Sequence, residues 1–316
     1  MSVAAFPVRE GTIPFKGYET WYRIVGEREE PGKLPLLLLH GGPGAAHDYL
    51  EALDAMAATG RRVIYYDQLG CGKSAIPESR PEMWTVDLFV EEVGVVREAL
   101  GLERVHILGQ SWGGMLGMEY ALTDPAGLAS LTIASSPASM IQWVEEANRL
   151  RAELPADVQE ALLRHEAAGT TDDPEYHAAM DVFYARHVCR VQPVPEEVQR
   201  SFDQIGEHPE VYHTMNGPSE FHVVGTLKTW DILDQIGKIR VPTLITSGRH
   251  DEATPAISGA IHERIEGSRW EIFEDSSHMP HCEEPERYAR VLDGFLSEVE
   301  RGEGVWPADD VEDRER

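Results

Sequence analysis

Short apolar runs that alternate along the chain with longer helical patterns constrain its fold more than any other feature. Each run is four residues long and is followed at once by polar or glycine-rich residues. This alternation predicts a mostly parallel central sheet flanked by helices, an α/β fold. The expected strands are Leu36–Leu39, Val63–Tyr66, Val105–Leu108, Leu131–Ala134, Thr243–Thr246 and Trp270–Phe273, with helices over Val86–Leu100 and Ala256–Ile265.

The segment 137–225 breaks this alternation. It has the pattern of helices separated by proline and glycine, as in Leu154-Pro155 and Pro193-Val194-Pro195. We therefore expect residues 1–136 and 226–300 to form the core, with 137–225 inserted as a helical cap. Residues 301–316 are acidic and lack apolar periodicity, which predicts a disordered tail.

The composition of the chain argues against nucleic-acid-binding, membrane-bound and disulfide-stabilised proteins. A net charge of −27 argues against nucleic-acid binding, because phosphate contacts need clustered Lys and Arg. No run of eighteen apolar residues and no secretory signal is visible, so we expect no membrane partner. Three scattered cysteines, Cys71, Cys189 and Cys282, do not form a disulfide framework and favour a cytoplasmic location. The sequence does not indicate an oligomeric state.

The run Gly109-Gln110-Ser111-Trp112-Gly113 follows the strand Val105–Leu108 directly, and helix-compatible residues follow it. Strand, sharp turn and helix are the setting of a nucleophile elbow, in which small residues two before and two after the serine prevent clashes across the bend. The alternative is a glycine-rich loop with a buried serine. The setting favours Ser111 as a nucleophile.

A serine hydroxyl needs an adjacent base, and the base needs an orienting acid. Asp251 and His278 follow the last two expected strands, so both should lie near Ser111 at the carboxyl edge of the sheet. His250 and His281 are competing bases, but neither is as well placed at a strand end. We therefore predict a Ser111–His278–Asp251 triad, in the chain order of α/β-hydrolases.

Stabilising the oxyanion of a tetrahedral intermediate requires backbone donors. The run His40-Gly41-Gly42-Pro43-Gly44 follows the strand Leu36–Leu39, and its small residues let backbone N–H groups come close to a substrate. A plain tight turn is the alternative. We predict that the N–H groups of Gly42 and Trp112 form the oxyanion hole.

Two other patterns resemble cofactor-binding motifs, but each lacks a residue that its motif requires. Gly70-Cys71-Gly72-Lys73-Ser74 ends like a phosphate-binding loop, but Asp67 replaces the first glycine that this motif requires. His278, His281 and Cys282 lack a second pair of metal ligands at the usual spacing. We therefore expect neither a metal nor another cofactor.

Four motifs together resemble the prolyl iminopeptidase family of α/β-hydrolases, and most closely its branch of tricorn-interacting aminopeptidases and L-amino-acid amidases. The segment Met215–Phe221, followed by Gly225-Thr226 and Trp230-Asp231, resembles the return of that branch from cap to core. Gln110 departs from the family, which often has a small residue there. The four motifs are His40–Gly44, Asp67–Ser74, Gly109–Gly113 and Gly248–Glu252.

The resemblance implies cleavage after a free N-terminal residue, commonly proline, in a short peptide or amino-acid amide. It also implies that Glu220 and Glu252 hold the substrate's terminal ammonium, because a buried ammonium needs paired negative charge. A surface or structural role is the alternative for both acids. The expected function is a serine aminopeptidase that works through an acyl-enzyme. An amino-acid amide or ester hydrolase with the same triad is the nearest rival, and a non-catalytic receptor is a distant one.

Overall fold

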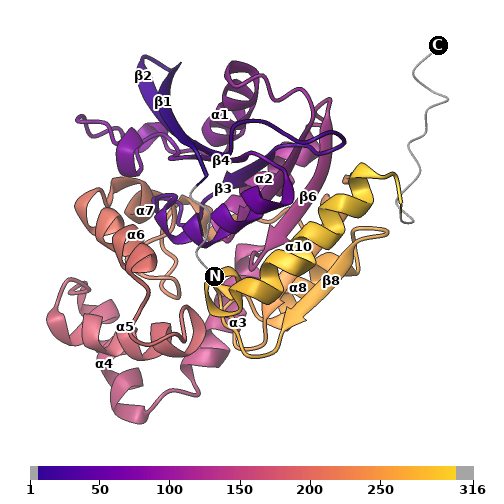
Figure 1. Ribbon diagram of the computed structural model, residues 1–316. Helices are drawn as coiled ribbons and strands as arrows, with labels where there is room; N and C mark the ends of the chain where they lie inside the picture. Colours follow the sequence, from indigo (N-terminus) through magenta and orange to yellow (C-terminus); the bar gives the residue numbers. More distant parts are fainter. Residues whose placement is uncertain (1–5, 304–316) are drawn as a thin grey trace.

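A mixed sheet of eight strands forms the centre of the structure, a computed structural model that describes residues 6–303 (Figure 1). The strands lie in the order β1-β2-β4-β3-β5-β6-β7-β8. Strand β2 pairs antiparallel with β1 and with β4, and all other neighbouring pairs are parallel. The strands are β1 (Val8–Phe15), β2 (Tyr18–Val25), β3 (Leu36–Leu39), β4 (Val63–Tyr66), β5 (Val105–Gln110), β6 (Leu128–Ala134), β7 (Thr243–Gly248) and β8 (Arg269–Phe273).

Helices cover both faces of this sheet, and their α-helical and 3₁₀ segments follow the strands in α/β order. The α-helices are α1 (Val86–Ala99), α2 (Trp112–Leu122), α3 (Met140–Arg151), α4 (Ala156–Ala168), α5 (Pro174–His187), α6 (Glu196–Glu207), α7 (Glu210–Met215), α8 (Pro255–His262), α9 (Pro280–Glu283) and α10 (Pro285–Glu300). The 3₁₀ segments are η1 (Asp48–Thr59), η2 (Gly72–Ser74), η3 (Pro81–Met83), η4 (Thr226–Thr229) and η5 (Ile236–Lys238).

Alternate residues of the central strands supply two separate apolar clusters. Leu37 and Leu39 of β3 pack in the cluster that includes residues of α1, α2 and α8. Leu36 and Leu38 pack in the other cluster, with η1 and α10. Since both faces of β3 are buried, its sequence is continuously apolar, as expected of a central parallel strand. The structure is therefore a three-layer α/β fold, as the sequence predicts.

All six predicted strands are present. The predicted runs at β3 and β4 coincide with the observed bounds, and the other four runs are each one to three residues shorter than the observed strand. Strands β1 and β2 were not predicted. Most side chains of β1 are exposed, and Gly11 and Pro14 interrupt its pattern, so it lacks the apolar run that marks the central strands.

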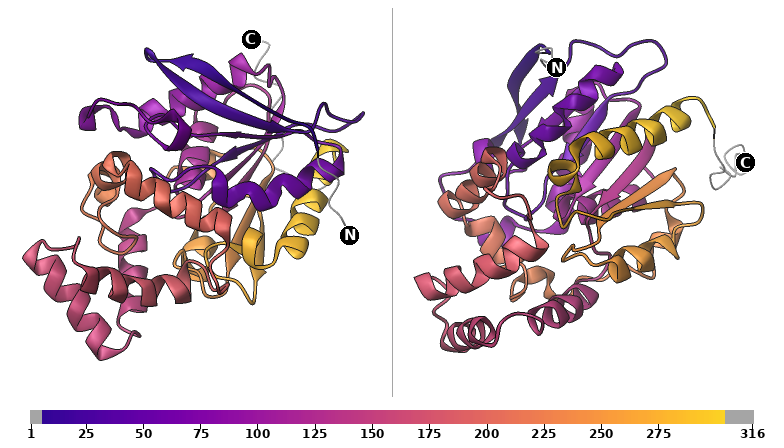
Figure 2. Two further views of the ribbon diagram at one scale, coloured as in Figure 1. Left: turned by 60° about the vertical axis from the view of Figure 1, so that its left-hand side comes forward. Right: turned by 60° about the horizontal axis from the view of Figure 1, so that its bottom comes forward.

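Helices α3 to α7 all lie between β6 and β7 in the chain, within the predicted insertion 137–225. Figure 2 shows them together on one side of the molecule. They have an apolar cluster of their own, which includes Leu162, Tyr176, Phe183 and Phe221. These helices, called the cap below, approach the loop after β3, where the backbone of Tyr212 comes close to Gly44. The predicted tail 301–316 lies almost wholly outside the described residues.

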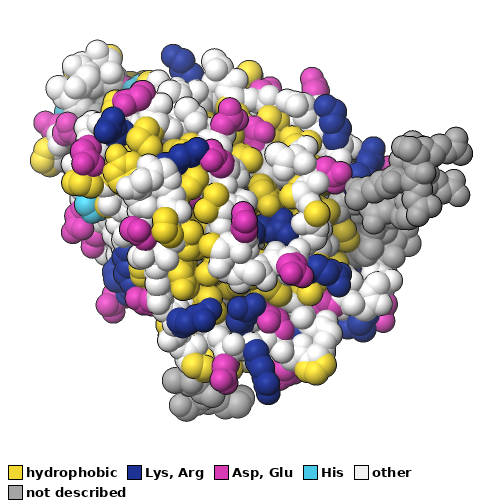
Figure 3. Space-filling model, turned by 90° about the horizontal axis from the view of Figure 1, so that it is seen from above, with side chains coloured by type: hydrophobic (Ala, Val, Ile, Leu, Met, Phe, Trp, Pro, Cys, Tyr) yellow, Lys and Arg dark blue, Asp and Glu magenta, His cyan; other side chains and the backbone are white. Residues whose placement is uncertain are grey.

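Charge is distributed over the surface. On the face drawn in Figure 3, Lys and Arg side chains are interspersed with Asp and Glu. Among residues 6–303, no helix has the length and apolar character that a membrane crossing requires.

Candidate active site

Ser111 occupies a sharp turn between β5 and α2. Its backbone has φ 55° and ψ −124°, in the positive-φ region that non-glycine residues rarely adopt. A Cβ at Gly109 would lie 1.9 Å from the carbonyl oxygen of Gly113, and a Cβ at Gly113 would lie 2.0 Å from that of Leu39. The two glycines are therefore required by the bend. This strained geometry is that of a nucleophile elbow.

His278 and Asp251 form a buried pair beside this turn. The Nδ1 of His278 lies 2.7 Å from Oδ1 of Asp251, which also accepts a hydrogen bond from the Ala253 N–H at 2.8 Å. Burial alone would lower the pKa of His278, but the Asp251 carboxylate outweighs it and the pKa is raised. Asp251 therefore orients the ring and stabilises its protonated form.

The competing histidines have other environments. His281 is buried with its Nε2 3.1 Å from the carbonyl oxygen of Tyr49, and burial lowers its pKa to about 4. His250 is exposed. Neither lines the cavity that contains Ser111, whereas His278 does.

That cavity has a volume of about 40 Å³ and lies between core and cap. Ser111, His278, Gly42 and both predicted ammonium ligands line it. Within the described residues no direct hydrogen bond joins Ser111 to His278. Such bonds are often long before a substrate binds. The structure thus brings the predicted catalytic and binding residues to one place.

The two predicted backbone donors, Gly42 and Trp112, lie beside Ser111. Gly42 has φ 111°, and a Cβ there would lie 2.5 Å from the Gly44 nitrogen, so only glycine fits. Trp112 is the first residue of α2, and the N–H groups of a helix's first turn have no partner within the helix. Gly42 and Trp112 both line a second small cavity together with Ser111. The arrangement suits an oxyanion hole.

A buried hydrogen-bond chain that the sequence did not predict links the glycine loop to the histidine. The Gly41 N–H donates to the Tyr49 hydroxyl at 2.7 Å, and that hydroxyl donates to Oε1 of Gln110 at 2.6 Å. The Gln110 amide then donates to the carbonyl oxygen of His278 at 2.9 Å. Gln110, the departure from the family pattern, therefore helps to fix the two loops on either side of Ser111.

The two predicted ammonium ligands differ in their surroundings. Glu220, in the irregular segment after α7, accepts a hydrogen bond from the Tyr212 hydroxyl at 2.6 Å. Glu252 is 1% exposed, and within residues 6–303 neither of its carboxylate oxygens has a hydrogen-bond partner. Its Oε1 lies 3.7 Å from the Nε2 of His278. A buried carboxylate without a hydrogen-bonded partner is costly, so Glu252 is suited to a cationic ligand.

Burial is the first cause of the raised pKa of both acids. At Glu220 the Tyr212 hydrogen bond and His278 partly oppose it. At Glu252 the nearby negative charges of Glu220 and Asp251 add to it, and the pKa is well above its ordinary value. When both are ionised, the two carboxylates repel each other, and a cation bound between them would offset this repulsion.

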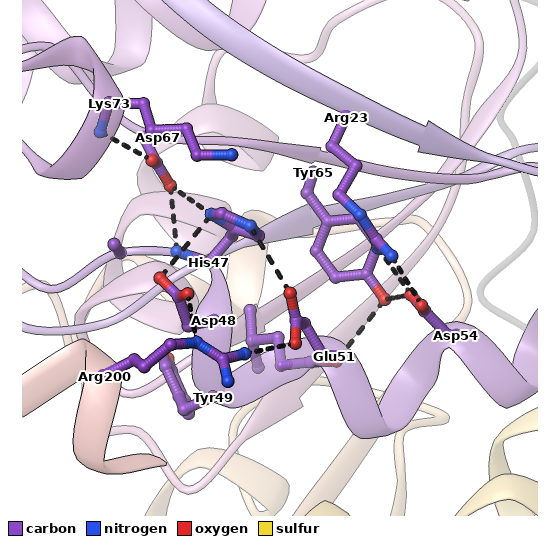
Figure 4. A network of polar contacts seen from close by, with 12 residues as sticks. Arg23, His47, Asp48, Tyr49, Glu51, Asp54, Tyr65, Asp67, Lys73 and Arg200 are labelled. Atoms are coloured by element: carbon purple, nitrogen blue, oxygen red, sulfur yellow. Dashed lines mark hydrogen bonds and ion pairs between the residues drawn. The ribbon is translucent and has the colours of Figure 1, made fainter. Parts of the chain in front are cut away.

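Two groups of side chains among residues 6–303 lie close enough to hold a metal, and neither includes His278, His281 or Cys282. One is His165, Asp173 and Glu175, two of which are exposed. The other, drawn in Figure 4, is His47, Asp48 and Glu51. In this second group the guanidinium of Arg200 from α6 already pairs with both acids. The phosphate-loop candidate is also internally bonded, since the Gly70 N–H donates to the Ser74 carbonyl.

Figure 4 also shows how the cap is attached to the core. The Arg200 Nε donates to Oδ1 of Asp48 at 2.9 Å. The Gln204 side chain donates to Oδ2 of the same carboxylate at 2.7 Å. The residue after Arg200, Ser201, accepts a hydrogen bond through its hydroxyl from the N–H of Tyr49 at 3.2 Å. Helix α6 is therefore fixed to η1, the segment that also carries the Tyr49 hydroxyl.

The sheet order, with Ser111 after β5, Asp251 after β7 and His278 after β8, defines an α/β-hydrolase. The family described as "alpha/beta hydrolase fold" matches residues 35–285. The chain belongs to the proline iminopeptidase family within that class.

Both sequence and structure comparisons carry this assignment. The proline iminopeptidase of Lactobacillus helveticus (strain DPC 4571) is 42% identical over 292 residues, which cover 92% of this chain and 98% of the relative. The proline iminopeptidase of Mycobacterium smegmatis is 48% identical, with a TM-score of 0.87 over 93% of this chain and 99% of that one. The crystal structure of VinJ is 49% identical, with a TM-score of 0.89 over 92% and 99%.

Proposed function

We propose that the protein is a serine aminopeptidase that releases an N-terminal residue, preferably proline, from short peptides or amides. The single observation that carries the substrate class is the buried carboxylate of Glu252, which lacks a hydrogen-bond partner within the described chain and lines one cavity with Ser111. The relatives named proline iminopeptidase support the preference for proline.

In this mechanism His278, oriented by Asp251, removes the proton of Ser111, which attacks the carbonyl carbon of the N-terminal residue. The N–H groups of Gly42 and Trp112 hold the oxyanion. The C–N bond then breaks, and His278 gives its proton to the departing amine. Water, activated by the same histidine, hydrolyses the ester on Ser111 and releases the amino acid.

The terminal ammonium of the substrate would lie between Glu220 and Glu252. An ammonium that is removed from water binds strongly only where negative charge compensates it. Two carboxylates can fully compensate the single positive charge of the ammonium. A blocked N-terminus brings no positive charge and would leave both acids uncompensated. This arrangement therefore restricts cleavage to the first peptide bond.

The test is the release of 4-nitroaniline from L-proline 4-nitroanilide by the purified protein, with N-acetyl-L-proline 4-nitroanilide as the matched control. We expect turnover of the first substrate and none of the second. Equal turnover of both would refute the ammonium role of Glu220 and Glu252. No turnover of either, with Ser111 intact, would refute the aminopeptidase.

The rival amide or ester hydrolase would use the same residues. Comparing prolinamide with a proline-initiated tripeptide separates the two, because only an aminopeptidase cleaves the peptide efficiently. We also propose that 137–225 acts as the substrate-binding cap on the core 1–136 and 226–300. A cytoplasmic location remains a prediction, which the free state of Cys71, Cys189 and Cys282 supports.

A further inference from the structure

A cavity of about 750 Å³ lies inside the cap, between α5, α6 and α7. The geometry points to a leaving-group site: we propose that this cavity binds the part of the substrate beyond the scissile bond and prefers uncharged or cationic leaving groups to anionic ones. The proposal rests on the proposed aminopeptidase function and adds to it a second determinant of specificity.

The cap cavity adjoins the cavity at Ser111. Val188, Phe202, Ile205 and Glu220 line both of them. A substrate chain that extends from the scissile carbonyl, held at Ser111, therefore reaches the cap cavity by passing three apolar side chains and one carboxylate. Glu220 also lines the second small cavity beside Ser111, so this proposed ammonium ligand lines all three cavities.

Only one of these cavities suits a chain of variable length. The second small cavity has a volume of about 10 Å³ and a lining of largely buried apolar residues, among them Met115, Met140 and Trp143. The cap cavity instead has exposed residues at its rim, including Asp181 and Gly206. When the ammonium is bound at Glu220, a leaving group of several residues can therefore occupy the cap cavity and extend past its exposed rim into solvent.

The charge of the lining gives the expected selectivity. Asp172, Asp181 and Glu220 are acidic, His177 and His213 are the histidines of the lining, and within residues 6–303 no Lys or Arg lines the cavity. Apolar and aromatic side chains, such as Met180 and Phe202, supply most of the remaining surface. An apolar segment with a positive charge matches this lining, whereas a carboxylate would face like charges.

Gly206 allows a direct test, because a Cβ there meets no atom within 4 Å and its backbone is helical. Gly206→Trp should fill part of the cap cavity. We expect kcat/KM for a proline-initiated pentapeptide to fall about tenfold or more, and that for L-proline 4-nitroanilide to change less than about twofold. Gly206→Ala controls for the helix, and Gly94→Trp, an equally open site on core helix α1, controls for an added tryptophan.

The second test varies charge. With the wild type we expect Pro-Lys-Lys-Leu to be cleaved about fivefold better than Pro-Glu-Glu-Leu at low salt, as two exposed pairs would give. Asp172→Asn/Asp181→Asn should bring this ratio towards one, and salt should do the same to the wild type. A ratio that the double variant leaves unchanged, or a Gly206→Trp effect equal on both substrates, would overturn the proposal. Wild type inactive on L-proline 4-nitroanilide would instead refute the underlying aminopeptidase.

Discussion

The core half and the cap half of this active site are built by different means. In the core, Ser111 and its partners follow strands, and backbone packing leaves no freedom: a Cβ at Gly248 would lie 2.1 Å from the carbonyl oxygen of Ser277. In the cap, Glu220 lies in an irregular segment and is held by side chains, through Tyr212 and through the Trp143 indole on its carbonyl. The proposed triad is therefore positioned by the sheet. The proposed ammonium site takes Glu252 from the core loop after β7 and Glu220 from the cap, and the side-chain contacts of Glu220 can change independently of the sheet.

Ser111→Ala tests the core half and should have the largest effect. We expect kcat for L-proline 4-nitroanilide to fall roughly 10⁴- to 10⁶-fold, because no other group can form the acyl-enzyme. The thermal midpoint should not fall, since the alanine keeps the turn. Steady-state kinetics and a melting curve check both. A loss below about tenfold would show that Ser111 is not the nucleophile.

Glu252→Gln tests the core's contribution to substrate choice. Removing one partner of a buried charge pair should lower kcat/KM for the proline anilide roughly 10²- to 10³-fold. The control is the rate at which a fluorophosphonate without an amine labels Ser111, because this reaction needs His278 but brings no ammonium. If the variant lost anilide turnover and labelling rate to the same degree, Glu252 would act on His278 and not on the ammonium.

The same substitution should stabilise the free protein. Burial and the nearby negative charges raise the folded-state pKa of Glu252 well above its ordinary value of 4.5, so the folded protein holds that proton more tightly than the unfolded chain does. The wild type therefore loses stability as pH rises above 4.5 until the raised pKa is passed. Glu252→Gln should gain about 1–3 kcal/mol at pH 8 and almost nothing at pH 4. Urea titrations at the two pH values check this, and a gain independent of pH would contradict it.

Tyr212→Phe tests the cap half. The variant removes the hydroxyl that donates to Glu220, so the pKa of that acid should rise further and the ammonium should bind less tightly. We expect KM to increase about tenfold, and kcat to change less. Tyr176→Phe, in the same cap but bonded to Ser219, is the matched control. A selective loss of kcat would place Tyr212 in the chemical step.

Arg200→Ala should have the smallest effect. Its ion pairs with Asp48 and Glu51 attach α6 to the core, but the side chain is 40% exposed and its contribution is screened by solvent. We expect about 0.5–1 kcal/mol of lost stability at low salt, and less at 1 M salt. Arg149→Ala removes ion pairs within the cap only and serves as control. A larger effect of Arg149→Ala would show that α6 does not depend on this attachment.

The core was more predictable from the sequence than the cap, for physical reasons. A central parallel strand buried on both faces has a continuous apolar run, and its carboxyl end marks where functional side chains lie, so Ser111, Asp251 and His278 were expected near one another. The edge strand β1 has no such run. The Tyr49–Gln110 hydrogen bond joins residues 61 positions apart, and no local pattern records it.

The position of the cap in the chain has a consequence for biosynthesis. Ser111 precedes the inserted helices, whereas Asp251 and His278 follow them, so the ribosome makes the proposed nucleophile long before its proposed base. A nascent chain that ends within the cap contains an elbow and an oxyanion loop but no proton acceptor for the serine. Such a chain cannot complete the proposed acyl transfer. Activity would begin only when β7 and β8 have joined the growing sheet, the last two strands to do so.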